Sequence, residues 1–158
     1  MRELPHTKSC FVCGENNPIG LQQRFETDGR TVRTRFTPRP EHAGFKGFIH
    51  GGILATLLDE IMVWACAVRT GKFGFCAEMT IRFQRPAAPG GELLVEAELV
   101  ADRRGRIFEA KAEVQDGGGE ILASATGKYM PIRDADMAAL QADMIGDAKW
   151  MQPNPGTK

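Results

Sequence analysis

Residues 50–68 read HGGILATLLDEIMVWACAV, the longest apolar stretch of the chain. Apolar side chains recur here with the period of a helix, which predicts a helix from Gly51 or Gly52 to about Val68, ended by a turn at 70–72. Such a helix, about 18 residues and roughly 27 Å long, is apolar on most faces and must be wrapped by other elements. Two acidic residues near its centre exclude a segment that crosses a bilayer.

The rest of the chain supplies strands for that wrapping. Downstream of the helix, apolar and polar residues alternate in four segments: 75–85, 93–99, 108–114 and 121–129. Turns rich in Pro, Gly and Asp separate them, as in an antiparallel meander. Upstream, residues 19–37 read as a hairpin around Asp28-Gly29. We therefore predict an α+β fold in which a sheet wraps one long helix.

Composition narrows the class of protein. The chain has 158 residues, with 20 Lys+Arg against 20 Asp+Glu and a net charge of zero. That length suits one domain, which we expect over 1–133 with a C-terminal helix and tail over 134–158. The balanced charge argues against a nucleic-acid partner and against a basic membrane anchor. The N-terminus has no apolar run typical of a signal peptide, so we expect a cytoplasmic protein with reduced cysteines.

The predicted helix has two unlike faces when its residues are placed at about 100° intervals. The broad apolar sector should pack on the sheet and holds Ile53, Leu54, Leu57, Leu58, Ile61, Trp64, Ala65 and Val68. The opposite sector is mostly small and holds Gly52, Ala55, Thr56, Asp59, Val63 and Cys66. A face of small residues lets a ligand or another backbone approach closely. Asp59 is the one charge there and is our first candidate for a functional acid; Glu60, nearer the apolar edge, is the second.

His50, Gly51 and Gly52 stand where the helix begins. The N–H groups of a first helical turn lack partners inside the helix, and the helix dipole adds positive potential. Such an end binds an anion or stabilises the oxyanion that develops on a reacting carbonyl. We therefore count His50 and Gly52 as candidate catalytic residues and Gly51 as a candidate substrate contact.

The segment from His50 to Asp59 resembles the His-Gly-Gly-x6-Asp signature of hotdog-fold acyl-CoA thioesterases, nearest to the phenylacetate-pathway and 4-hydroxybenzoyl-CoA thioesterase branches. The segment 81–87, IRFQRPA, is similar to the strand that follows the helix in those proteins, and 123–127, ASATG, to their last strand. The opening CFVCG at 10–14 with NPIGL at 17–21 resembles that of bacterial members. The likeness covers about residues 10–131.

This resemblance implies a curled sheet around the helix and a homodimer, or a dimer of dimers, with active sites at the subunit interface. Asp59 would act as general base or nucleophile in thioester hydrolysis. The Gly52 N–H, beside His50, would polarise the carbonyl opposite Asp59 of the other subunit. Cys76 falls where relatives carry a Ser or Thr that orients the water.

The resemblance also implies residues that contact the acyl-CoA substrate. Some relatives place an Asn or Gln near Gly44, where His42 is the nearest polar side chain here. Arginine forks suit phosphate oxygens, so the turn carrying Arg103, Arg104 and Arg106 is a candidate contact for coenzyme A, as Glu60 is for the substrate. The residues that could border an acyl pocket, or serve as core, are Phe45, Phe48, Met62 and Trp64. No cofactor beyond the coenzyme A of the substrate is expected.

Two other interpretations remain open. The same scaffold could bind acyl-CoA or an acyl carrier without catalysis, since a Cys at position 76 is a poorer hydrogen-bonding group than a hydroxyl. Alternatively, Cys10 and Cys13 form a CxxC that could belong to a zinc module, with His6 as a third ligand. A single CxxC is only half of a zinc motif, and two cysteines in a turn near the terminus give the same pattern. We therefore expect no metal.

Overall fold

Helix α1 spans Gly51–Thr70 in the computed structural model, which describes residues 1–147. His50 caps its first turn, and the chain leaves the helix at Gly71, whose φ of 74° is a left-handed conformation that a residue without Cβ adopts at little cost. The helix therefore runs two residues beyond the predicted end at Val68. The tail expected over 148–158 lies outside the described residues.

The sheet around α1 is antiparallel, and its strands follow one another in space in the order β1-β3-β4-β6-β7-β8-β5. In chain order its strands are β1 (Arg2–Glu3), β3 (Glu26–Thr27), β4 (Thr31–Phe36), β5 (Gly74–Phe83), β6 (Leu93–Asp102), β7 (Phe108–Gln115) and β8 (Ile121–Pro131). A second, two-stranded sheet pairs β2 (His6–Thr7) with β9 (Met144–Ile145). A short 3-10 helix, η1 (Pro40–His42), precedes α1, and helix α2 (Asp134–Asp143) follows β8.

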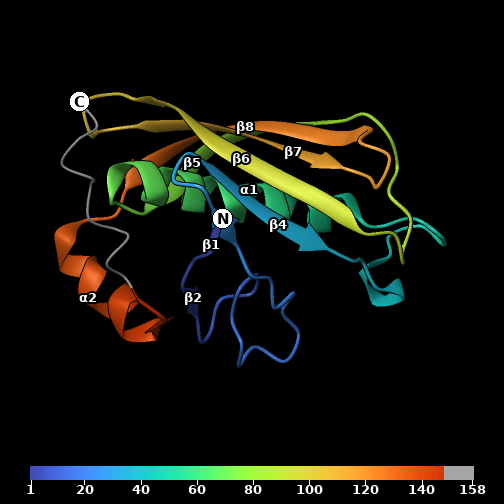
Figure 1. Cartoon of the computed structure of the whole chain (residues 1–158), viewed down its shortest axis with the longest axis horizontal. Helices are drawn as coiled ribbons and strands as arrows, with labels where there is room; N and C mark the ends of the chain where they lie inside the picture. The colour runs from blue at the N-terminus through green and yellow to red at the C-terminus, as the bar shows by residue number, and fades with distance from the viewer. Residues whose placement is uncertain (148–158) are drawn as a thin grey trace.

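The core lies between α1 and the concave face of the sheet, which crosses the helix from one side (Figure 1). Leu57 and Leu58 of α1 are fully buried, as is Val95 of β6. Among residues 1–147, α1 is also the one helix long and apolar enough to cross a membrane, but half of that stretch is buried inside this fold. The predicted α+β architecture, a curled sheet wrapped around one long helix, is confirmed.

Two details of the prediction are wrong. Strand β5 does not continue a meander into β6; it lies at the edge of the sheet beside β8, because β6 pairs with β4 on one side and β7 on the other. Cys66 does not lie on an open helix face either, since its side chain is fully buried together with Ala65 and Ala67. All four residues of the run 64–67 are buried, whereas Asp59 stays partly accessible.

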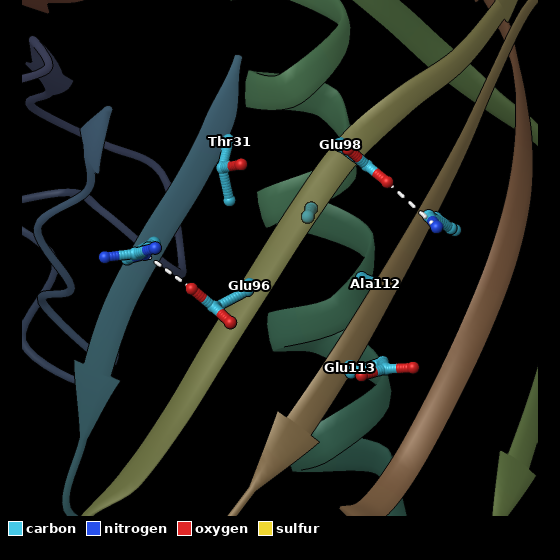
Figure 2. A pocket seen from close by; sticks show the side chains of 8 residues that line it. Thr31, Glu96, Glu98, Ala112 and Glu113 are labelled. Atoms are coloured by element: carbon cyan, nitrogen blue, oxygen red, sulfur yellow. Dashed lines mark ion pairs between the residues drawn. The ribbon is translucent and has the colours of Figure 1, made fainter. Parts of the chain in front are cut away.

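The convex face of the sheet carries the charged residues that alternate with the core residues. A hollow of about 270 Å³ lies on this face. Figure 2 shows the side chains that line it, with α1 behind the strands. Ion pairs cross neighbouring strands there, between Arg33 and Glu96 (2.5 Å) and between Lys111 and Glu98 (2.8 Å). The charges on both sides of the hollow are thus neutralised by one another, which is typical of a solvated sheet surface.

Because α1 is largely buried, shortening one of its core side chains should strongly lower the free energy of unfolding. Leu57→Ala should lower the free energy of unfolding by about 2–5 kcal/mol, because it leaves a cavity between helix and sheet. Ile19→Ala removes an aliphatic side chain from an exposed loop and should change it by less than about 0.5 kcal/mol. Urea unfolding of both variants measures the difference, and equal values would contradict the packing described.

Candidate active site

Asp59, in the middle of α1, faces β5 and β8. The Tyr129 hydroxyl, on β8, donates a hydrogen bond to Oδ1 of Asp59 at 3.0 Å. Cys76, on β5, brings its thiol to the same carboxylate and hydroxyl. The three side chains come from three elements that are far apart in sequence, and the pairing of β5 with β8, in which Cys76 lies opposite Tyr129, brings two of them together.

Burial determines the protonation of the two groups that contact Asp59. Loss of solvent, and then the negative charge of Asp59, raise the pKa of Tyr129, so its hydroxyl stays protonated and donates. The same two causes raise the pKa of the Cys76 thiol. The carboxylate therefore has two neutral neighbours that can orient it without forming an ion pair.

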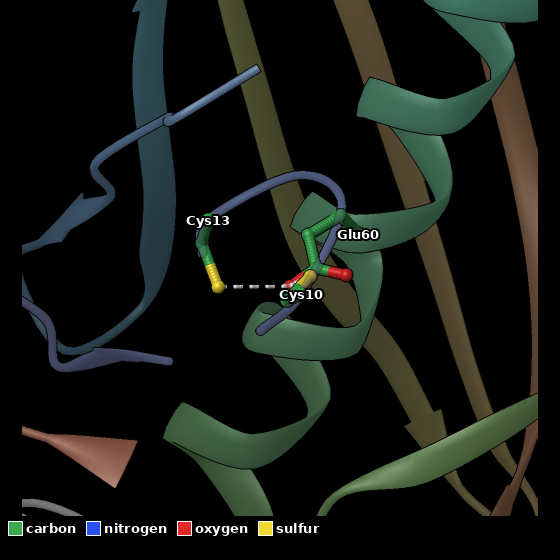
Figure 3. A group of neighbouring side chains, drawn as sticks. All are labelled: Cys10, Cys13 and Glu60. Atoms are coloured by element: carbon green, nitrogen blue, oxygen red, sulfur yellow. Dashed lines mark hydrogen bonds between the residues drawn. The ribbon is translucent and has the colours of Figure 1, made fainter. Parts of the chain in front are cut away.

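Glu60, the next residue, points elsewhere. Its Oε1 accepts a hydrogen bond from Trp64 Nε1 at 3.0 Å and lies 3.7 Å from the sulfur atoms of both Cys10 and Cys13. Burial raises the pKa of the Glu60 carboxyl well above its usual range. Hydrogen bonding with the neighbouring Cys13 lowers the pKa of the Cys10 thiol to about 5. Glu60 thus belongs to a cluster with the N-terminal segment (Figure 3), and that cluster could hold a metal ion.

A pocket of about 290 Å³ adjoins both acids. It lies between α1, the start of β5, the N-terminal segment and the α2 region, and its lining residues include Asp59, Glu60, Cys76, Cys10, Trp64, Phe75 and Leu140. Most of the side chains between the two acids and α2 are apolar, so the pocket combines a carboxylate with an apolar wall. Such a combination is typical of a site for a small organic substrate.

The beginning of α1 forms a separate part of the surface. Nδ1 of His50 accepts a hydrogen bond from the N–H of Gly52 at 2.8 Å, so this histidine caps the helix. The Gly52 N–H, which we predicted to donate to a substrate carbonyl oxygen, is therefore already paired within the chain. Within residues 1–147, the N–H of Gly51 donates to no other group. A Cβ at position 51 would lie 3.4 Å from the ring of Phe83, which therefore flanks this helix end.

These two parts of α1 do not meet within one chain. Asp59 lies seven positions after Gly52, which places the two residues about 11 Å apart along the helix axis. Neither His50, Gly51 nor Gly52 lines the pocket next to Asp59. A single thioester carbonyl cannot contact both the beginning of α1 and Asp59 of the same chain. These two parts of α1 could act on one carbonyl only if they come from two copies of the chain.

The predicted phosphate contacts also lie away from the pocket. Arg103, Arg104 and Arg106 form the turn between β6 and β7, and none of them lines the pocket. Arg103 makes a two-pronged ion pair with Glu109, at 3.1 and 3.2 Å. A role of these arginines toward coenzyme A stays a prediction.

Three of the four residues proposed to border an acyl pocket lie elsewhere. Phe45 and Phe48 project from the loop before α1, with 87% and 47% of their surface exposed, and Met62 is fully buried in the core. Trp64 does line the pocket, with its indole N–H directed at Glu60. The apolar wall that the loop was expected to provide is formed instead by Phe73, Phe75 and the α2 region.

His42 is held inside the loop before α1. Its ring stacks on Phe36 with the centroids 5.4 Å apart, and its Nδ1 accepts the backbone N–H of Arg39 at 3.0 Å. Burial lowers the pKa of His42, so the ring stays neutral in that place. A side chain at Gly44 would contact His50 at 3.2 Å, and the loop therefore packs tightly against the residue that caps the helix.

Tyr129 is the candidate site residue that the sequence analysis missed. Its side chain is fully buried. A tyrosine among alanines and a glycine on the buried face of β8 is the signal that could have marked it, because a buried hydroxyl requires a hydrogen-bond partner. Its partner, Asp59, lies 70 residues earlier in the chain.

Comparisons with known proteins point to one family. The family model described as the thioesterase superfamily matches residues 46–123. Acyl-coenzyme A thioesterase 13 of Homo sapiens is 29% identical over 85 residues, which are 52% of this chain and 60% of that protein. The chain thus spans less than two thirds of the length of the curated relatives that it matches.

Solved structures show the same fold. A thioesterase superfamily protein is 28% identical with a TM-score of 0.71, over 77% of this chain and 59% of that one. The PaaI protein of the Escherichia coli phenylacetic acid degradation operon has a TM-score of 0.65 at 22% identity, over 72% and 81% of the two chains. A Streptococcus mutans protein, solved bound to acetyl-CoA, has a TM-score of 0.63 at 21% identity, over 68% and 86%.

The cap on α1 gives a test of the local geometry. His50→Ala should lower the free energy of unfolding by about 1 kcal/mol, because it leaves the Gly52 N–H without its acceptor. His50→Ser should retain most of that stability, since a serine hydroxyl accepts a hydrogen bond from the same turn. Urea unfolding compares the three proteins, and an alanine variant as stable as the serine variant would show that the cap contributes nothing.

Proposed function

The chain belongs to the thioesterase superfamily, and we propose that it hydrolyses an acyl-CoA thioester to a carboxylic acid and free coenzyme A. The observation that carries this proposal is the Asp59 carboxylate, held by the Tyr129 hydroxyl at the wall of a pocket. A carboxylate with one oxygen held in this way still has lone pairs that accept a proton from water or attack a carbonyl carbon.

The reaction needs two kinds of group around the thioester. Asp59 serves as general base, taking a proton from a water that attacks the carbonyl carbon, or attacks that carbon itself. The carbonyl oxygen then becomes an oxyanion, which is stabilised by N–H donors at the beginning of a helix. When the C–S bond breaks, the coenzyme A thiolate leaves and takes up a proton. The acyl-enzyme route requires a further water to release the acid.

The oxyanion donors come from α1 of a second copy in this proposal. Gly51 offers an N–H without a partner in residues 1–147, whereas Gly52 donates to His50 and becomes available only if the cap opens. The separation of about 11 Å along one helix supports a site shared between two chains. The Cys76 thiol, near the carboxylate, takes the position from which a water is oriented.

The edge strand β5 is the surface on which the second copy would bind. β5 has ten residues and, among residues 1–147, pairs on one side only, with β8. Phe75 and Phe83 expose 63% and 52% of their surface there. A long, apolar edge strand without cover is rare, because it pairs readily with another chain. Pairing of two β5 strands would continue the sheet and bury these rings.

The pocket favours an acyl group of modest size. Its volume of about 290 Å³ is at the lower end for small-molecule sites, and Val63, Trp64 and Phe73 are among its walls. These walls suit an aromatic or a medium-chain acyl group better than a charged one. The solved relative with acetyl-CoA supports a coenzyme A thioester as the substrate class.

Replacing the carboxylate tests the proposed reaction. Asp59→Ala should lower kcat for acyl-CoA hydrolysis by at least about 100-fold, since general acid–base groups contribute about 10²–10⁴. Binding of coenzyme A, measured by calorimetry, should stay within a few-fold of wild type. Asp134→Ala, at an exposed position of α2, is the control and should leave both unchanged. Unchanged turnover in Asp59→Ala would contradict the role of Asp59, and binding without any turnover in the wild type would favour a non-catalytic acyl-CoA sensor.

A single turnover in water labelled with oxygen-18 tests Asp59 as a nucleophile. A general base sends the label directly into the carboxylic acid and never into the protein. A nucleophile forms a mixed anhydride with the acyl group, and attack of water on its Asp59 carbonyl carbon leaves the label on the protein and sends an unlabelled oxygen of Asp59 into the first acid released. Label on Asp59 therefore identifies the nucleophile, whereas attack of water on the acyl carbon labels the acid in either route. Mass spectrometry of the acid and of the peptide that carries Asp59 reads both outcomes.

The proposed interface predicts a change of mass in solution. The wild-type chain of 17.3 kDa should elute at twice that mass or at a multiple of it. Phe83→Glu should shift it toward the monomer and lower hydrolysis in parallel, because it places a charge in the apolar contact. Val100→Glu, at an exposed apolar position of β6, is the matched control and should stay dimeric and active. Light scattering during gel filtration measures the masses; a wild-type monomer at micromolar concentration would overturn the interface.

A further inference from the structure

We propose that Cys10, Cys13 and Glu60 bind a zinc ion that ties the N-terminal segment to helix α1 beside the active-site pocket. One ligand atom from each residue lies within 4.8 Å of the other two. Figure 3 shows the two sulfur atoms, on the turn of the N-terminal segment, directed at the carboxylate of α1. The N-terminal turn thus provides two thiols, which are soft ligands, and α1 provides a carboxylate, which is a hard ligand, at one place. The cysteines lie 47 to 50 residues before Glu60 in sequence.

The turn that carries the two cysteines is built to hold both sulfurs on one side. The Gly14 N–H donates to the carbonyl oxygen of Cys10 at 2.9 Å, and a Cβ at Gly14 would lie 2.3 Å from that oxygen, so only glycine fits there. The backbone N–H of Val12 donates to Sγ of Cys10 at 3.2 Å. N–H groups directed at a sulfur favour its thiolate form, which is the form that binds a metal.

Outer hydrogen bonds orient the other ligand atoms. Trp64 Nε1 donates to Oε1 of Glu60 at 3.0 Å, which directs the carboxylate toward the turn. Thr7 contacts Sγ of Cys13 at 3.5 Å through its hydroxyl, which also accepts the N–H of Cys10 at 3.1 Å. Partners of this kind, which hold the ligands of a metal rather than the metal itself, are a regular feature of protein metal sites.

No ion pair reaches the ligand atoms of the cluster within residues 1–147, since Arg24 donates to the backbone carbonyl oxygen of Cys13 and not to a side chain of the cluster. No lysine, arginine or histidine in residues 1–147 forms an ion pair with Glu60. Two thiols and a carboxyl group gathered in a partly buried place repel one another once they ionise. A divalent cation removes that repulsion. This is the interaction that the described residues leave unfilled.

The ligand types favour zinc among the divalent cations. Thiolates select soft or borderline metals, and zinc accepts two thiolates together with a carboxylate in a tetrahedral arrangement. Three protein ligands leave a fourth position, which a water can take, because the neighbouring pocket reaches both Cys10 and Glu60. The proposal departs from our prediction from sequence that this chain holds no metal.

The third ligand differs from the one considered from sequence. His6 does not join the cluster: its Nε2 lies 2.9 Å from the carboxylate of Glu15. Glu60 takes that place, one residue from Asp59 on α1. The zinc site goes beyond the proposed hydrolysis, and its test reads metal content, so either proposal can fail while the other stands.

Metal analysis tests the proposal directly. The full-length protein, loaded with zinc and dialysed, should retain one zinc ion per chain by elemental analysis. Cys10→Ser and Cys13→Ser should lose at least nine tenths of it, and Glu60→Gln should weaken zinc binding at least about 10-fold. Cys76→Ser, a thiol-to-hydroxyl change at an exposed position outside the cluster, is the matched control and should retain full zinc.

A measurement on the unaltered chain covers the case in which a variant does not fold. Protein stripped with a chelator and titrated with Co²⁺ should develop the visible absorption of tetrahedral thiolate-bound cobalt, saturate at one ion per chain and lose the band when zinc is added. A wild-type chain that retains no zinc and shows no cobalt band would overturn the proposal. A Cys10–Cys13 disulfide in protein purified without reductant would show as the loss of two hydrogens in mass. If that protein also binds no metal after reduction, the proposal is overturned as well.

Discussion

The enclosure of one apolar helix determines where reactive groups can stand in this molecule. α1 is apolar nearly all round, and water is removed from it only because the sheet curls over one side while the N-terminal segment and the chain after β8 approach the other. Much of its second half, including Cys66, is buried as a result. Two accessible places, its beginning and the turn around Asp59 and Glu60, carry the candidate site residues. Its last residues, Arg69 and Thr70, are accessible as well.

The two acids of that turn show how strongly neighbours decide the chemistry of a side chain. Consecutive residues of a helix point about 100° apart, so Asp59 and Glu60 enter different surroundings. Asp59 meets a hydroxyl and a thiol from the sheet, which orient it and keep it available for reaction. Glu60 meets two sulfurs and an indole N–H, in a place where its own ionisation is costly without a cation. Under the two proposals, the same chemical group serves catalysis at one position and metal binding at the next.

Much of the fold, and the choice of Asp59 as a candidate, could be predicted from sequence because both depend on local periodicity. The helix, the strand segments and the preference for Asp59 follow from which residues share a face, and a face is set by residues a few positions apart. The place of β5 could not be predicted, since alternation in a strand tells which side chains point inward but not which strand lies alongside. The same limit hid Tyr129, whose partner is 70 residues away, and Glu60, whose sulfur neighbours are about 50 residues away. Contacts of that kind are decided by tertiary packing.

Strand β5 links the two accessible places of α1, and this favours a site that two chains share. Cys76, near its start, adjoins Asp59, and the ring of Phe83, at its end, flanks Gly51. If two β5 strands pair antiparallel around a two-fold axis near the middle of the strand, Cys76 of one copy comes opposite Phe83 of the other, because an isologous contact exchanges the two ends. The carboxylate of one chain then faces the helix start of the second. In such a pair, symmetry would close the distance of about 11 Å that no substrate carbonyl can bridge within one chain, at both ends of the strand pair at once.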